Sequence, residues 1–161
     1  MIRSALRSSR LGLGLLATAL VFFMVAACTV PTATPTPTAT PQPVESIKVS
    51  LLVQKGDQET RWFRDLQVPK GADAFELTKI ATGGDFKATY YPQYRSHFVE
   101  AILGTENQGS NYWLIWLWND LDKKWEFLPV GADFYSVKDG QVLAWYYADT
   151  SQEGKPPPVT P

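Results

Sequence analysis

One short stretch, Gly109 to Asn119, limits the folds open to this chain more than any other. It contains Trp113, Trp116 and Trp118, three of the chain's six tryptophans. Aromatic and β-branched residues favour strands, and the alternation of a strand puts Trp113 on one face and Trp116 and Trp118 on the other. Both faces are apolar, so one of them should cover a core. The other is either buried as well, as in a central strand, or exposed as an aromatic shelf that would mark a binding surface.

The start of the chain predicts export and a lipid anchor. Residues 1–10 contain three arginines and no acidic residue, and residues 11–27 are apolar or small, which is typical of a secretory signal peptide. The sequence Val25-Ala26-Ala27-Cys28 resembles the bacterial lipoprotein signal, in which the cysteine becomes the lipidated first residue of the mature protein. We therefore expect a signal peptide over 1–27, lipidation of Cys28 with acyl chains such as palmitate, and a location on the extracytoplasmic face of the cell membrane. An uncleaved transmembrane anchor is the alternative.

Residues 28–43 form a segment rich in proline and threonine after Cys28. Such a composition cannot build a core and favours an extended polyproline II spacer. Removing the three leader arginines leaves 12 basic residues against 16 acidic ones and no basic stripe, which argues against a nucleic-acid partner. The single cysteine excludes an internal disulfide.

The remaining pattern predicts one domain over 44–149 and a disordered tail over 150–161. Its helix begins at the N-cap Asp73, has Glu76 three residues later, and ends at Gly83-Gly84, with Leu77 on the core face. The expected strands are 47–54, 60–68 with a bulge, 86–91, 112–118, 125–128 and 141–148. The segment 98–103 fits either a short strand or a helical turn.

The sequence lacks the common signatures of catalysis and of metal binding. No serine–histidine–acid set, glycine-rich phosphate loop or zinc cluster is present, so we expect no enzyme and no cofactor beyond a bound ligand. His97, the only histidine, has no second ligand at metal-binding spacing and is expected on the surface or in a loop. Asp120, Asp122 and Asp133 could supply calcium ligands by composition, but they lack EF-hand spacing and Lys123-Lys124 interrupts them.

The order of several short motifs resembles that of a known family. These motifs are Phe98 to Gly104, Tyr112-Trp113 with the strand that ends at Asn119, Gly131 to Tyr135, Lys138-Asp139-Gly140, and the last strand with Trp145 and Tyr147. They resemble the carboxy-terminal domain of transcobalamin and intrinsic factor, and its relatives in bacterial surface lipoproteins. The resemblance implies an α+β fold, a β-grasp-like mixed sheet with one packed helix. The family commonly has Asn-Gly where this chain has Asn119-Asp120, and Gly-Asp where it has Gly140-Gln141.

The resemblance and the aromatic residues together suggest a binding module. We expect a lipid-anchored extracytoplasmic domain that binds a corrinoid or another flat, partly apolar small molecule through Trp116, Trp118, Trp125 and Tyr135. In vitamin carriers the corrin lies between this domain and a helical barrel, and no stretch of this sequence resembles that barrel. The alternative function is a cell-surface protein-interaction or adhesion module that uses the same aromatics or an exposed sheet edge. All four residues could instead be core.

Overall fold

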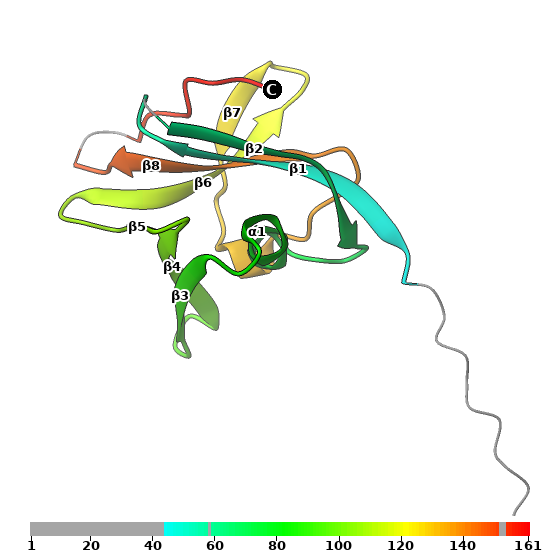
Figure 1. Cartoon of the computed structure of the whole chain (residues 1–161), viewed down its shortest axis with the longest axis horizontal. Helices are drawn as coiled ribbons and strands as arrows, with labels where there is room; N and C mark the ends of the chain where they lie inside the picture. Colours follow the sequence, from blue (N-terminus) through cyan, green and yellow to red (C-terminus); the bar gives the residue numbers. More distant parts are fainter. Residues whose placement is uncertain (1–43, 58, 152–153) are drawn as a thin grey trace, which may run out of the picture. The chain divides into compact units, whose positions relative to one another are not determined.

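The expected aromatic strand is β6, Asn111–Asn119, and it lies inside a five-stranded sheet of order β2-β1-β8-β6-β7 (Figure 1). The computed structural model describes residues 44–57, 59–151 and 154–161, which belong to one unit, Pro41–Pro161. The predicted signal peptide, Cys28 and the spacer over 28–43 lie outside the described residues. No helix in the described ranges is long and apolar enough to cross a membrane.

The first and last strands of the sheet are neighbours. The strands are β1 (Ser46–Lys55), β2 (Glu59–Pro69), β7 (Lys124–Phe127) and β8 (Val142–Asp149), in addition to β6. β1 and β8 pair in parallel, and every other pair in this sheet is antiparallel. A parallel pair needs a long crossover, and the whole middle of the chain supplies it.

The predicted bulge lies in β2. Val49 pairs with Leu66 and Leu51 pairs with Phe63, so the two residues between Phe63 and Leu66 face only Ser50. One of them, Asp65, has a φ of 51°, a region that side chains other than glycine adopt at a cost. Its backbone N–H donates a hydrogen bond to the Ser50 hydroxyl at 3.1 Å, which helps to hold this conformation.

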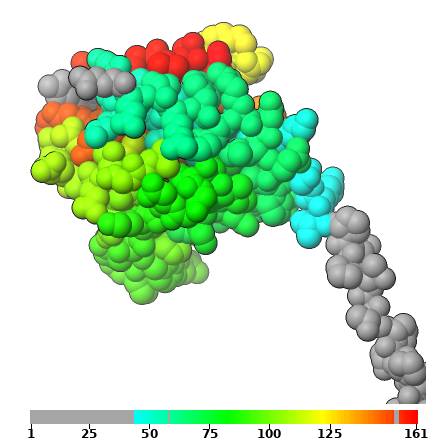
Figure 2. Space-filling view, in the orientation of Figure 1, coloured from blue at the N-terminus to red at the C-terminus, as the bar shows by residue number. Residues whose placement is uncertain are grey.

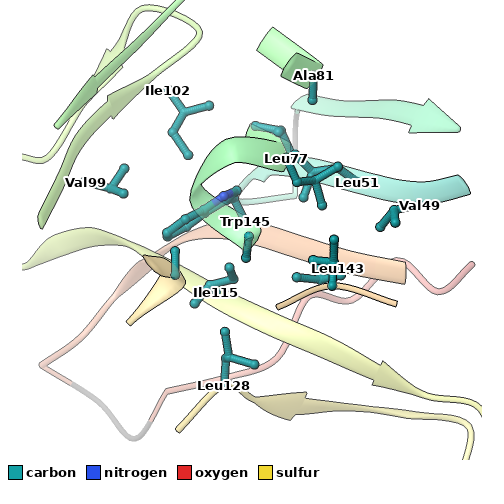
Figure 3. Packing of buried hydrophobic residues seen from close by; sticks show 14 of the residues in the cluster. Val49, Leu51, Leu77, Ala81, Val99, Ile102, Ile115, Leu128, Leu143 and Trp145 are labelled. Atoms are coloured by element: carbon teal, nitrogen blue, oxygen red, sulfur yellow. The ribbon is translucent and has the colours of Figure 1, made fainter. Parts of the chain in front are cut away.

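The only α-helix among the described residues is α1, Ala74–Thr82, as predicted. The carboxylate of Asp73 accepts a hydrogen bond from the Glu76 N–H at 2.7 Å, and Gly83 ends the helix in the left-handed region with a φ of 61°. Leu77 is fully buried against the sheet, close to Leu51 (Figure 3). The helix therefore covers one face of the sheet, as the apolar spacing indicated.

A second, three-stranded antiparallel sheet projects from the domain (Figures 1 and 2). It consists of β3 (Phe86–Tyr91), β4 (Ser96–Ile102) and β5 (Thr105–Glu106), so the segment 98–103 is mainly strand. Val99 and Ile102 of β4 are buried in the same core as Leu77 (Figure 3). The last short element before β8 is the 3-10 helix η1, Ala132–Phe134.

Candidate functional site

The face of the large sheet opposite α1 carries a second apolar cluster, which we call the tryptophan face. All five strands and the C-terminal tail contribute to it: Leu52, Trp62, Leu114, Trp116, Trp118, Trp125, Val142, Ala144, Tyr146 and Val159. The alternation of β6 predicted this division, because Trp113 and Ile115 belong to the core beneath α1. Both faces of the central sheet therefore carry packed side chains.

Trp116 and Trp125 are the buried centre of the tryptophan face, with only 5% and 7% of their surfaces exposed. The Trp118 and Trp125 rings meet edge to face at 5.2 Å between centroids, and the Trp116 and Phe127 rings do so at 5.4 Å. Such geometry stabilises aromatic pairs beyond their buried area. Of the two alternatives for this strand, burial on both sides holds at Trp116, and Trp118 is half-buried.

The C-terminal tail packs on this face. We predicted a disordered tail, but Pro157 is buried and the Val159 carbonyl accepts a hydrogen bond from Trp125 Nε1 at 2.8 Å. In Figure 2 the C-terminal residues lie against β7. The tail has no apolar periodicity of its own, so no local pattern predicts this contact. Proline-rich chain loses less backbone entropy on ordering, which makes a few contacts with an existing surface sufficient.

A cavity of about 360 Å³ opens beside Trp116. Its walls are Leu114, Trp116, Phe127, Thr150 and Gly154, and they are mainly apolar. A Cβ placed on Gly154 would lie 3.6 Å from Leu114 Cδ1 and 4.0 Å from Trp116 Cζ2, which is ordinary contact. Cζ2 is thus the Trp116 atom that comes within contact distance of this position.

Trp116 Nε1 is an unusual donor. It is buried, and no group in the described part of the chain accepts its hydrogen bond. A buried donor without a partner costs about 1–3 kcal/mol. Most buried polar groups in folded proteins have a partner, so an unpaired one beside a cavity indicates a place for an acceptor.

Tyr135, the fourth predicted ligand-binding residue, is not brought together with the three tryptophans. It follows η1 and packs against the core beneath α1, on the other side of the sheet from Trp116. Its hydroxyl accepts a hydrogen bond from Gln141 Nε2 at 2.8 Å. The sequence prediction grouped Tyr135 with the tryptophans only because it is aromatic. In the structure Tyr135 packs in a different cluster from Trp116, Trp118 and Trp125.

His97 and Asp133 form a polar junction between β4 and η1. The Asp133 carboxylate accepts hydrogen bonds from the Ser96 hydroxyl, the His97 N–H and the His97 ring, each at 2.7 Å. Burial raises the pKa of Asp133, but these hydrogen bonds outweigh it and hold the pKa below its usual value. The His97 ring stacks on Phe75 with centroids 4.2 Å apart. His97 is thus a half-buried strand residue, whereas we expected a surface or loop position.

This junction has the residue types of a catalytic triad but not its arrangement. In a triad the imidazole accepts the proton of the serine hydroxyl. Here the Ser96 hydroxyl donates to Asp133 instead, and the carboxylate lies between the serine and the histidine. The hydroxyl is held by an acid that is already ionised, so the geometry provides no activated nucleophile.

The acidic residues considered for calcium have other partners. Asp120 pairs with Lys123 at 2.6 Å and Asp122 pairs with Lys124 at 3.0 Å. Across residues 44–57, 59–151 and 154–161, no three histidine, cysteine or acidic side chains gather where they could hold a metal ion.

A larger cavity, of about 550 Å³, has polar walls that include Lys55, Glu106, Asn107 and Tyr147. Two of its polar side chains already have partners. Asn107 donates to the Val99 carbonyl and accepts from the Trp113 N–H, and the Tyr147 hydroxyl donates to the Glu106 carbonyl. These two side chains hold the two sheets together.

The structure also shows an aromatic surface that the sequence analysis did not predict. We call it the hairpin patch, and its exposed members are Tyr91, Tyr94, Phe98 and Phe134, which line one cavity. Three tyrosines within residues 90–94 were the only sequence signal. Phe134 comes from η1, and only the fold brings it near them.

The five-stranded mixed sheet crossed by one helix defines an α+β, β-grasp-like domain. The same fold occurs in haptocorrin, solved in complex with Cbi, at a TM-score of 0.55 and 18% sequence identity. That likeness covers 68% of this chain and 27% of haptocorrin, so the chain spans about a quarter of the length of that carrier. It confirms the resemblance to the transcobalamin family at the level of the fold.

A second solved structure shares the fold. It is a candidate metal-binding protein from Ruminococcus gnavus ATCC 29149, with a TM-score of 0.50 and 16% identity over 64% of this chain and 97% of that one. No protein-family model and no curated protein matches the sequence.

Proposed function

We propose that this chain is a lipid-anchored, extracytoplasmic binding module without enzymatic activity. Its ligand is a flat, partly apolar small molecule, with a corrinoid as one candidate, and the ligand occupies the cavity beside Trp116. The observation that carries the proposal is this mainly apolar cavity, whose wall residue Trp116 has a buried Nε1 without an acceptor in the described chain.

The chemistry of the cavity selects the ligand class. Leu114, Phe127 and the Trp116 ring offer apolar contacts, and the buried Trp116 N–H has no acceptor in the described chain. A ligand with an apolar ring edge and a carbonyl or amide oxygen would match both. A volume of about 360 Å³ is at the small end for ligand pockets, so a corrinoid would insert only an edge or a side chain.

The fold and the start of the sequence support the proposed setting. Haptocorrin, which shares the fold, binds a corrinoid. Cys28 follows three small residues, as lipidation requires, and the proline- and threonine-rich spacer would hold the domain away from the membrane. Trp118 and Trp125 take a supporting role in this proposal, because they pack the wall next to Trp116.

The test is a tryptophan-fluorescence titration of residues 44–161, which belong to one unit, with cobinamide, cobalamin and a flat apolar dye. We expect saturable binding of at least one of them. Gly154→Leu should weaken it at least tenfold, because the new side chain would enter the cavity while the position itself is exposed.

Leu121→Ala is the matched control, since Leu121 is 94% exposed and does not line the cavity. It should bind like the wild type. Binding that survives Gly154→Leu unchanged would place the ligand elsewhere on the domain and contradict the proposed site. Absence of binding by all three probes would contradict the proposed ligand class.

A further inference from the structure

The hairpin patch surrounds a cavity of its own, of about 300 Å³. Its walls come from the β3–β4 hairpin and from η1, and they include Tyr91, Tyr94, His97, Phe98 and Phe134. The β3–β4 hairpin belongs to the projecting sheet (Figure 1), and this cavity shares no residue with the cavity beside Trp116. It therefore requires its own explanation, independent of the proposed function.

The walls of this cavity are aromatic, and two of them are nearly perpendicular. The Tyr91 and Phe98 rings meet at 85° with their centroids 6.5 Å apart. Tyr94, Phe98 and Phe134 are 72%, 46% and 56% exposed, values that are high for large apolar side chains. Rings at right angles form a corner, whereas a platform for a flat ligand needs parallel or coplanar rings.

One carboxylate lies behind the wall of the cavity. No lysine or arginine is among the wall residues, and Arg95, between the wall residues Tyr94 and Ser96, is not one of them. Ser96 and His97 line the cavity, and both hydrogen-bond to the Asp133 carboxylate behind them. Asp133 is ionised at neutral pH, because those hydrogen bonds keep its pKa low.

Gly131 keeps one side of the cavity open. A Cβ at this position would come within 2.7 Å of the Ser96 hydroxyl and 3.6 Å of Phe134 Cδ2. A side chain there would displace the Ser96 hydroxyl from Asp133, whereas its distance to Phe134 would be ordinary contact. The glycine thus preserves the hydrogen bond to the carboxylate.

We propose that the cavity between the β3–β4 hairpin and η1 binds an organic cation of the quaternary-ammonium class. A cation over aromatic faces is attracted by the ring quadrupoles, and its methyl groups bury apolar surface against the same rings. Aromatic walls set at right angles can contact such a roughly spherical group from more than one side. The Asp133 carboxylate adds a longer-range attraction, since it lies behind the two polar wall residues.

The test compares choline with 3,3-dimethyl-1-butanol, in which a neutral carbon replaces the charged nitrogen. Residues 44–161 are titrated with each probe at constant ionic strength, and amide chemical shifts are followed by NMR. We expect the largest shifts at residues 91–98 and 131–134. Choline should bind about tenfold more tightly than the neutral probe, which corresponds to a cation–π contribution of ordinary size.

Two variants and one control make the site testable. Phe98→Leu keeps an apolar side chain but removes one aromatic wall, and Asp133→Asn keeps the volume but removes the charge. Each should weaken choline binding, with less effect on the neutral probe. Leu121→Ala is the control, because Leu121 is 94% exposed and lines neither this cavity nor the one beside Trp116. If Asp133→Asn disturbs the fold, the choline affinity of Phe98→Leu alone tests the proposed site.

Vesicles distinguish the source of the cation. Phosphatidylcholine vesicles that bind the domain, when phosphatidylglycerol vesicles do not, would identify a lipid headgroup, and binding of free choline alone would identify a soluble solute. Equal affinity for choline and the neutral probe would overturn the proposal. So would an absence of shifts at residues 91–98, or a partner protein that binds this patch and is not displaced by choline.

Discussion

The indole nitrogen of Trp145 donates a hydrogen bond of 2.7 Å to the hydroxyl of Thr78. Trp145 is on the central strand β8 and Thr78 is on the buried face of α1, so this contact fixes the helix against the sheet with a defined register. The Thr78 hydroxyl in turn donates to the Ala74 carbonyl at 2.7 Å. Both side chains are buried, so each group depends on the other to satisfy its hydrogen bonds.

We predict that Thr78→Val destabilises the domain by about 1–3 kcal/mol, because it keeps the shape but leaves Trp145 Nε1 buried without an acceptor. Urea unfolding measures the difference. In a Trp145→Phe background the same substitution should lower the free energy of unfolding clearly less, since the indole N–H that would lose its acceptor is absent. Equal costs in both backgrounds would show that the hydrogen bond does not contribute.

Leu77→Ala should destabilise the domain by about 2–5 kcal/mol, because the side chain is fully buried beneath α1. Ile80→Ala is the control on the same helix, since Ile80 is 39% exposed and should cost much less. Chemical denaturation of both variants separates the buried face from the outer one. A similar small loss for both would mean that α1 does not pack as described.

The sequence predicted much of this fold because local signals agreed with the pattern of burial. Asp73, Glu76 and Gly83 marked the ends of α1, and the alternation in β6 assigned its two faces correctly. The bulge in β2 also followed from a break in the apolar phase. In each case the residues that determine the element are close together in the sequence, so helix or strand periodicity reveals it.

The candidate site was less predictable, because it depends on contacts between distant segments. The buried state of Trp125 depends in part on the Val159 carbonyl, and the position of Asp133 depends on β4. Neither contact is marked by a pattern among neighbouring residues of the sequence. Residue type alone grouped Tyr135 with the tryptophans, and the structure separates them.

Trp116→Ala should lower the stability of the domain by about 3–5 kcal/mol, because the indole is buried in the tryptophan face. Trp116→Phe should cost much less, since it fills most of the volume and removes the unpaired N–H. Thermal unfolding compares the two. If Trp116→Ala is as stable as the wild type, the indole is not packed and an open shelf is the better description.

Asp133 should make stability depend on acid pH. Its pKa is below the usual value in the folded state, so the unfolded chain takes up the proton first as the pH falls. The stabilisation is complete above the unfolded pKa of about 3.9 and is lost as the pH falls through the lower folded value. We expect Asp133→Asn to be less stable at pH 7, and the difference from the wild type to shrink on acidification. A difference that is constant with pH would contradict this role.

Cys28→Ala should abolish incorporation of a palmitate analogue during growth, because Cys28 is the only thiol of the chain. Metabolic labelling followed by gel fluorescence measures it. Thr29→Ser is a control that leaves the cysteine in place and should be labelled normally. Continued labelling of Cys28→Ala would refute the proposed lipid anchor.

The parallel pairing of β1 with β8 has a consequence for how the molecule is made. Ser50 pairs with Val142, so the central strand of the sheet is nearly the last to be synthesised. Until β8 has left the ribosome, β1 and β6 have no common neighbour and the sheet stays in two pieces. Contacts of such long sequence separation form slowly. The sheet therefore stays incomplete until β8 is available, a condition that would suit the export proposed above, in which the chain crosses a membrane before it folds.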